Sequence, residues 1–374
     1  MDREVKKIMF SGGGTGGSVM PLLAVAEELI KDGPVEIIFV GSVSGPEKDL
    51  IVSFNKSLSR GTTPLVYVSL PGGKWRRYFS WRNFLDIFVT LSGFFQALAI
   101  LDRYRPDLVV SAGSFVSVPL IWAAAWKRIP ILIHQQDIRP GLANKLMAPC
   151  ARAVTVTFEK SLIDYGPKAA LVGNPIKNLT GYKERTTDTK QKYHLNQSLP
   201  LVLITGGATG ATRINELVFA AAKELSGFCQ LVHLTGQGKL TDRRVPSLTN
   251  YHALEFVPNE ELLNLMAASD LVVSRAGLGV LTELAALAKP VILIPIPDSH
   301  QEDNAALFVR QGAAVVLEQK ELTPNKMILA IKDLLADYEK QVRLSQQIAK
   351  IIKPGAAEKM AAIIWEMIKT NVKK

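Results

Sequence analysis

The chain has 374 residues, of which 48% are hydrophobic and 21% charged, so it should fold into globular domains rather than stay disordered. Its length suits two α/β domains of about 170 to 190 residues each. The two cysteines, Cys150 and Cys229, lie far apart in sequence, which argues against a disulfide framework and supplies no metal-ligand spacing. The N-terminus shows no signal-peptide pattern, so the expected compartment is the cytoplasm.

The net charge of +10 calls for an anionic partner or a solvated basic surface. Nucleic acid is a weak candidate because no nucleic-acid-binding motif accompanies the charge. Residues 74–82 (KWRRYFSWR) mix four cations with four aromatic side chains, which favours an anionic membrane surface. The apolar segment from Phe84 to Leu101 is interrupted by Asp86 and Gln96, which predicts a buried or interfacial helix rather than a transmembrane span. A solvated basic loop over a core helix is the alternative.

The first half opens as a strand, a glycine-rich loop and a helix. Ile8 to Phe10 is the strand, residues 11–18 (SGGGTGGS) are the loop, and apolar residues recur on one helical face from Leu22 to Ile30. The five glycines permit positive φ angles and a close approach of the backbone to a ligand. Their spacing is neither the dinucleotide fingerprint nor a nucleoside-triphosphate phosphate loop, so nicotinamide and ATP chemistry lose support.

Further strands alternate with helices in this half, which predicts a parallel sheet whose site lies at the carboxyl ends of the strands. These strands are expected at residues 108–111, 131–134, 153–156 and 170–172. His134 ends one of them, and a packed, hydrogen-bonded histidine is expected there rather than a catalytic base. The predicted domains are residues 1–174 and 175–353, with a C-terminal helix over 354–374 that packs back on the first domain.

The opening pattern recurs in the second half. A strand at 201–205 leads into the glycine loop 206–210 and a helix from Ile214. Further strands are expected at 231–234, 253–256, 271–274, 291–294 and 314–317. Two glycine-loop units of the nucleotide-binding type favour a group-transfer enzyme whose donor and acceptor occupy different domains.

The turn at residues 275–279 joins a buried strand to a helix through two glycines. Such a turn presents free backbone N–H groups and the positive end of the helix dipole, and phosphate is the group that most often binds there. Glu283 follows in the first helical turns, where a carboxylate could bridge two ribose hydroxyls. His300, Gln301 and Asn304 follow the next strand, so phosphate, ribose and sugar contacts of a sugar nucleotide are expected together. An ordinary strand-turn-helix-strand unit with polar loop residues is the alternative.

Eight motifs then occur in one order along nearly the whole chain. They are GGGTGG (12–17), GSFVSVP (113–119), HQQDIRPGLANK (134–145), VGNP (172–175), GGATGATRIN (206–215), EFV (255–257), SRAG…TE (274–283) and HQEDNA (300–305). In this combination the chain resembles the MurG family of N-acetylglucosaminyltransferases, glycosyltransferase family 28.

The resemblance implies a GT-B fold, in which two Rossmann-like, doubly wound parallel-sheet α/β domains face each other across a cleft. It implies an inverting transfer of N-acetylglucosamine from UDP-N-acetylglucosamine to the 4-hydroxyl of a muramoyl peptide on undecaprenyl diphosphate. This step converts lipid I to lipid II in peptidoglycan synthesis. It also implies a peripheral location on the cytoplasmic face of the plasma membrane and no cofactor or metal.

The resemblance also assigns site residues, with uracil beside Phe256 and Val257 and the ribose at Glu283. The other expected donor contacts are Lys177, Ala208, Leu278, Gly279, Val280, Leu281, Thr282, His300, Gln301 and Asn304. The expected acceptor contacts are Thr15, Gly16, Gly17, Phe115, Asp137 and Asn144.

Several positions depart from the family's pattern. Ser18 stands in place of a histidine, Gln135 in place of a glutamate and Asp137 in place of an asparagine. Ala208 replaces a serine, and Lys177 replaces an arginine and so loses its bidentate fork. Asp137 and Ser18 are the candidate catalytic residues, and one hypothesis is that Asp137 removes the proton from the acceptor hydroxyl.

Three other functions remain open at this point. They are a related transferase with a different lipid-linked acceptor, a UDP-N-acetylglucosamine 2-epimerase, and a donor-binding protein that has lost catalysis through Ser18.

Overall fold

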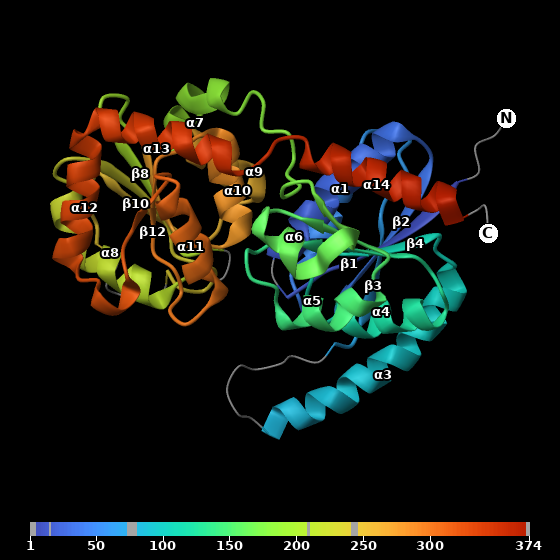
Figure 1. Ribbon diagram of the computed structural model, residues 1–374. Coiled ribbons are helices and arrows are strands. Elements are labelled where there is room, and N and C mark those ends of the chain that lie inside the picture. The colour runs from blue at the N-terminus through green and yellow to red at the C-terminus, as the bar shows by residue number, and fades with distance from the viewer. Residues whose placement is uncertain (1–4, 15, 73–80, 208–209, 241–245, 372–374) are drawn as a thin grey trace. The chain divides into compact units, whose positions relative to one another are not determined.

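The computed structural model describes residues 5–14, 16–72, 81–207, 210–240 and 246–371, without the side chains of 81–88 and 183. The chain forms two compact units (Figure 1). Unit 1 comprises Met1–Lys177 and Lys353–Lys374, and unit 2 comprises Asn178–Ile352. The basic and aromatic segment 74–80, Thr15 and Ala208 lie outside the described residues.

The described part of unit 1 contains a seven-stranded parallel sheet in the order β3-β2-β1-β4-β5-β6-β7. Its strands are β1 (Lys6–Ser11), β2 (Val35–Ser42), β3 (Val66–Leu70), β4 (Leu108–Ser111), β5 (Ile131–Gln135), β6 (Ala153–Val156) and β7 (Ala169–Leu171). The central strands β1, β4 and β5 are buried apart from the first two residues of β1, because helices cover both faces of a doubly wound sheet.

The helices of unit 1 include one from the far C-terminus. They are α1 (Met20–Asp32), α2 (Glu47–Ser57), α3 (Trp81–Tyr104), α4 (Ser117–Trp126), α5 (Leu142–Met147), α6 (Lys160–Tyr165) and α14 (Ala356–Asn371). Figure 1 shows α14 beside α1, and Met360 and Ile364 share a buried cluster with Leu22. Helix α3 packs against α4. None of the described helices is both long enough and apolar enough to span a membrane.

Within the described residues of unit 2, six parallel strands are arranged in the order β10-β9-β8-β11-β12-β13. The strands are β8 (Leu201–Thr205), β9 (Gln230–Leu234), β10 (Tyr251–Leu254), β11 (Leu271–Ser274), β12 (Val291–Leu293) and β13 (Val315–Val316). The helices are α7 (Thr186–Lys192), α8 (Thr212–Leu225), α9 (Asn259–Ala268), α10 (Leu278–Leu287), α11 (His300–Arg310), α12 (Pro324–Ala336) and α13 (Tyr338–Ile351).

The expected pair of doubly wound parallel sheets is confirmed. In each sheet the chain reverses its direction of winding between two central strands, β1 and β4 in unit 1 and β8 and β11 in unit 2. Ligands of such sheets bind where the strand order reverses, at the carboxyl ends of the strands. Both glycine loops follow one of these strands, so the topology places them at the two reversal points.

One expected strand was misplaced by two residues. The segment 253–256 was predicted as a strand, whereas β10 spans Tyr251–Leu254. Tyr251 pairs with Leu231 in register, and its hydroxyl bonds the Nδ1 of buried His233 at 2.8 Å. These two contacts extend the strand toward its N-terminus, and no local pattern in the sequence indicates them.

Candidate functional site

In unit 2, the turn after β11 leads directly into α10. The first bond of the helix runs from the Leu281 N–H to the Gly277 carbonyl at 3.1 Å. The amides of Leu278, Gly279 and Val280 therefore precede the hydrogen-bonded turns, as at any helix N-terminus. The side chains of Leu278 and Leu281 are buried in the core. These two side chains serve the core, and the free backbone amides of the turn are suited to bind an anion.

Thr282 supports the same turn from inside the helix. Its side chain is buried, and its hydroxyl donates to the Leu278 carbonyl at 2.7 Å. A structural role for the Thr282 hydroxyl follows from this bond.

The glycine loop after β8 needs its glycines for steric reasons. A Cβ on Gly206 would lie 2.5 Å from the Ala211 nitrogen. Gly210 has a φ of +66°, and a Cβ there would collide with the Thr235 carbonyl oxygen. The backbone therefore turns tightly at the reversal point of the sheet.

Glu283 is half-buried on α10, and burial raises the pKa of its carboxyl group to about 7. Among the residues that the structure describes, Glu283 has no hydrogen-bond or ion-pair partner. A carboxyl group without a partner can accept hydrogen bonds from a ligand's hydroxyls. Because its pKa is about 7, the ionised fraction of Glu283 changes with pH near neutrality.

The rim after β12 lies against the α10 turn. Asn304 is fully buried and donates through Nδ2 to the Ala276 carbonyl at 3.1 Å. Gln301 accepts from the Ile296 N–H at 3.1 Å, and its Nε2 lies 3.8 Å from where a Cβ of Gly277 would be. The structure thus brings Gln301 and Asn304 to the α10 turn. Asn304 holds the turn, and the Gln301 amide nitrogen lies beside it.

Helix α11, which carries Gln301 and Asn304, begins with a side-chain cap. The Ser299 hydroxyl accepts from the Gln301 N–H at 3.2 Å and donates to the Ile296 carbonyl at 2.7 Å. His300 is half-buried at the first position of the helix. The cap fixes the backbone from which both side chains project.

Arg275 is a functional candidate that the sequence did not single out. Its Nη1 donates to the carbonyls of Ile294 and Pro295 at 2.9 and 3.2 Å, and its Nη2 donates to Gln319 Oε1 at 2.6 Å. Burial lowers the pKa of this guanidinium. Arg275 therefore fixes the chain after β12 to the turn before α10. The SRAG motif contains it, but no pattern shows that its side chain points inward.

Phe256 and Val257 lie between β10 and α9. The Phe256 side chain is 60% exposed, whereas Val257 is 8% exposed. Phe256 is therefore free to cover a planar ring, and Val257 is anchored in the protein. The segment is held by the Gly236 N–H, which donates to the Glu255 carbonyl at 2.9 Å.

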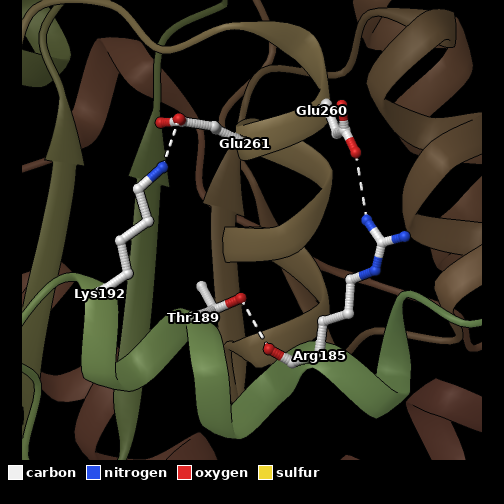
Figure 2. A network of polar contacts seen from close by, with 5 residues as sticks. All are labelled: Arg185, Thr189, Lys192, Glu260 and Glu261. Atoms are coloured by element: carbon white, nitrogen blue, oxygen red, sulfur yellow. Dashed lines mark hydrogen bonds and ion pairs between the residues drawn. The ribbon is translucent and has the colours of Figure 1, made fainter.

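Helix α9, which follows Val257, is attached to α7 and the residue before it, Arg185, by the polar network in Figure 2. Arg185 pairs with Glu260 at 3.1 Å, and Lys192 pairs with Glu261. Tyr193 also donates to Glu261 at 2.7 Å, and the hydrogen bonds from Lys192 and Tyr193 lower the pKa of that carboxyl group. Exposed pairs of this kind each stabilise by less than about 1 kcal/mol. The network therefore connects α9 to the α7 segment and contributes little to the stability of the fold.

In unit 1, the glycine loop after β1 is closed by Ser18. The Ser18 hydroxyl accepts from the Gly13 N–H at 2.9 Å and lies 3.2 Å from the Gly13 carbonyl, to which it donates. Gly16 and Gly17 are half-buried in the short 3-10 helix Gly16–Ser18. The Ser18 hydroxyl is therefore engaged with the backbone of its own loop.

His134 is fully buried at the end of β5. Its Nδ1 lies 3.0 Å from the Thr155 hydroxyl, and its Nε2 lies 3.1 Å from Asn174 Oδ1. Since Asn174 Oδ1 only accepts, Nε2 carries the proton and Nδ1 accepts from Thr155. Burial lowers the pKa of His134 to about 4. The expectation of a packed, hydrogen-bonded histidine is confirmed.

Gln135 organises the loop that carries Asp137. Its Nε2 donates to the carbonyls of Asp137 and Arg139 at 2.6 and 3.3 Å. Its Oε1 accepts from Asn144 Nδ2 at 2.7 Å and from the Tyr165 hydroxyl at 2.8 Å. A glutamate could not donate to the two carbonyls, so this arrangement requires an amide. The Asp137 side chain is half-buried on the loop.

Asn144 connects this loop to the segment after β4. Its Oδ1 is buried without a hydrogen-bond partner in the described part of the chain and lies 3.4 Å from the place of a Cβ on Gly113. Gln136 donates to the Ala112 carbonyl at 2.9 Å, and Phe115 is half-buried nearby in sequence. Polar contacts thus connect the loop of Asp137 and Asn144 to the segment at Ala112 and Gly113, and Phe115 packs against the apolar core.

Lys177 is exposed at the last position of unit 1 before the chain enters unit 2. The structure therefore places it outside the unit that carries the other donor residues. Within the described residues, no group of three or more His, Cys, Asp or Glu side chains has a metal-binding arrangement.

Comparisons with known proteins agree with this geometry. Residues 8–156 match the glycosyltransferase family 28 N-terminal domain, and residues 201–360 match the glycosyltransferase family 28 C-terminal domain. A relative from Clostridium botulinum (strain Langeland) is 40% identical over 87% of this chain and 89% of its own length. It is named UDP-N-acetylglucosamine–N-acetylmuramyl-(pentapeptide) pyrophosphoryl-undecaprenol N-acetylglucosamine transferase.

Two solved structures share the fold at low sequence identity. Acinetobacter baumannii MurG superposes with a TM-score of 0.71 at 23% identity, covering 96% of this chain and 99% of that one. The UDP-GlcNAc 2-epimerase from Neisseria meningitidis, bound to UDP-GlcNAc, superposes with a TM-score of 0.69 at 14% identity, covering 96% and 100%. The fold is therefore common to transferases and epimerases, and the 40% identity favours the transferase.

Proposed function

Because this chain belongs to glycosyltransferase family 28, we propose that it transfers N-acetylglucosamine from UDP-N-acetylglucosamine to the 4-hydroxyl of the muramoyl sugar of lipid I, giving lipid II. The observation that carries the proposal is the 40% identity, over 87% of the chain, to a relative named for that transfer. The acceptor is a muramoyl peptide on undecaprenyl diphosphate, and the product is used in peptidoglycan synthesis.

The donor binds in unit 2, at the reversal point of its sheet. The diphosphate lies at the N-terminus of α10, where the first amides and the helix dipole stabilise negative charge. Glu283 accepts hydrogen bonds from the ribose hydroxyls, and Phe256 covers the uracil while the Val257 backbone bonds it. Gln301 and His300 contact the sugar. The glycine loop around Ala208 completes the phosphate contacts.

The acceptor hydroxyl attacks the anomeric carbon while the bond from that carbon to the diphosphate oxygen breaks, so UDP leaves with the electron pair and the configuration inverts. Asp137 takes the proton of the attacking hydroxyl. The leaving diphosphate gains negative charge as the bond breaks, so the α10 amides stabilise the transition state more than the ground state. Asn144, Phe115 and the loop at Thr15, Gly16 and Gly17 hold the acceptor.

The transfer itself is tested with the purified protein, UDP-N-acetylglucosamine and lipid I. We expect one UDP and one lipid II per turnover. UDP-N-acetylglucosamine alone is the control, since an epimerase would convert the donor without any acceptor. UDP-sugar binding with no product from lipid I or from any other lipid-linked sugar would contradict the proposal and indicate a binding protein.

We propose in addition that unit 1 binds the cytoplasmic face of the plasma membrane, where the lipid tail of the acceptor resides. Residues 74–82 supply cations and aromatic side chains. Helix α3 begins within this segment at Trp81, and its Leu91 and Phe95 are 50% and 68% exposed. Large apolar side chains beside a basic segment suit an anionic lipid interface.

Replacing Trp75, Arg76 and Arg77 together by serine should weaken sedimentation with anionic vesicles by about 30-fold. Each cation near such a surface contributes about 1 kcal/mol, and two are removed. The matched control replaces Tyr338, Lys340 and Arg343 on α13 by serine and should bind as the wild type does. Equal binding by the first variant and the wild type would exclude this surface.

A further inference from the structure

A carboxylate lies directly beneath the glycine loop of unit 1. Glu47 is the first residue of α2, and its side chain is 0% exposed. Its Oε1 accepts a hydrogen bond from the Gly14 N–H, and both carboxylate oxygens lie 3.1 Å from the Ser42 hydroxyl. The ion pairs found among the described residues do not include it. Glu47 therefore interacts with neutral donors and with the N-terminus of its own helix.

The hydrogen bonds of Glu47 and those of Ser18 jointly fix the glycine loop after β1. The Gly13 N–H donates to Ser18 and the Gly14 N–H donates to Glu47, so two consecutive amides bond two different side chains. Gly14 has a φ of +81°, a conformation that this clamp maintains. Among the residues that the structure describes, the amides of Gly16 and Gly17 have no hydrogen-bond partner.

Neighbouring glycines pack closely around the Glu47 carboxylate. A Cβ on Gly13 or Gly45 would collide with the Glu47 carboxylate, and a Cβ on Gly41 would lie 2.9 Å from the Tyr67 ring. Tyr67 donates to the Ser42 carbonyl at 2.5 Å, and burial together with Glu47 raises the pKa of Tyr67 to about 12. Burial of a carboxylate is unfavourable unless the group is hydrogen-bonded. The close packing around the Glu47 carboxylate therefore indicates that Glu47 has a function.

We propose that Glu47 is a positioning residue for the acceptor. It acts through Gly14 to set the conformation of the glycine loop, and it does not touch the substrate. Hydrogen bonds to a carboxylate are about twice as strong as those between neutral groups, which suits a residue that must hold a glycine-rich loop in one conformation. The inference rests on the proposed function, because the loop is assigned there to the acceptor.

Glu47→Ala should raise the KM for lipid I at least tenfold and leave the KM for UDP-N-acetylglucosamine unchanged. Glu47→Gln should recover most of the loss, since its Oε1 can accept from Gly14 while its Nε2 donates to Ser42. Asp49→Asn, an exposed residue in the same turn of α2, is the matched control and should behave as the wild type. An equal rise of both KM values, or no rise in the Glu47→Ala variant, would overturn the proposal.

Hydrogen exchange of the peptide that covers residues 12–18 gives a readout independent of turnover. We expect faster exchange in Glu47→Ala than in Glu47→Gln, with unit 2 peptides unchanged. If the wild type makes no lipid II, the proposed function fails, and exchange still decides whether Glu47 holds the loop. Unchanged exchange in both variants would refute that role.

Discussion

Glu283→Gln is expected to raise the KM for UDP-N-acetylglucosamine by about 10- to 100-fold with a smaller effect on kcat. A hydrogen bond to a charged group contributes about 1.5–3 kcal/mol, and the substitution removes the charge that accepts the ribose hydroxyls. Glutamine keeps the shape of the side chain, so the packing of α10 should survive. Steady-state kinetics with the donor varied at saturating lipid I measures the change.

The same residue should make donor binding depend on pH. Burial raises the Glu283 pKa to about 7, and the ionised form accepts hydrogen bonds from hydroxyls more strongly than the neutral form does. The wild-type KM for the donor should therefore fall as the pH rises from 6 to 8, and the Glu283→Gln variant should lose this dependence. Glu339→Gln, at an exposed position of α13, is the control. A wild-type KM that is flat over this range would contradict the assignment of Glu283.

Stability should change in the opposite direction with pH. The ordinary pKa of this carboxyl group is 4.5, and the folded state holds its proton up to about 7. The contribution of Glu283 to the free energy of unfolding is therefore fully present below pH 4.5 and is lost as the pH rises through 7. The proposed donor binding would thus require the ionised state of Glu283, which burial in the fold disfavours.

Asp137→Asn should lower kcat by about 10²- to 10⁴-fold, which is the usual contribution of a general base. The KM for UDP-N-acetylglucosamine should stay unchanged, because Asp137 belongs to unit 1 and the proposed donor site belongs to unit 2. The Gln135 side chain donates to the Asp137 backbone carbonyl at 2.6 Å, so the loop should keep its conformation in the variant. Rapid-quench measurement of lipid II formation separates the chemical step from product release.

Asp164→Asn, at an exposed position on α6, is the matched control and should retain wild-type turnover. If Asp137→Asn leaves turnover and its pH profile unchanged, another group removes the proton. The Ser18 hydroxyl would be a poor substitute, since it donates to the Gly13 carbonyl and accepts from the Gly13 N–H.

Much of the fold could be predicted from local patterns. The strands at Leu108–Ser111, Ala153–Val156, Leu201–Thr205 and Leu271–Ser274 were expected at these residues. Buried parallel strands are short, continuous apolar runs, and their loops carry glycine, so the pattern is strong. The strand at Tyr251–Leu254 was misplaced because its limits depend on partners in β9.

Less of the candidate site than of the fold could be predicted from the sequence. The sequence indicated that Gln301 and Asn304 follow a strand, but not that Asn304 would bond Ala276 and hold the α10 turn. It also gave no sign of Arg275 and Glu47 as buried hydrogen-bonding centres. A charged residue near a helix start usually faces solvent, and only the packing around it shows otherwise.

The amino-acid sequence by itself determined the two parallel-sheet units, the place of each glycine loop and the family to which the chain belongs. These depend on residue spacing along the chain, which local sterics and hydrophobic periodicity translate directly into strands, turns and helices. Only the tertiary structure decided which polar side chains serve the fold and which are left for a ligand. That distinction depends on partners that are far apart in sequence, such as Gly14 and Glu47, because a hydrogen bond requires proximity in space.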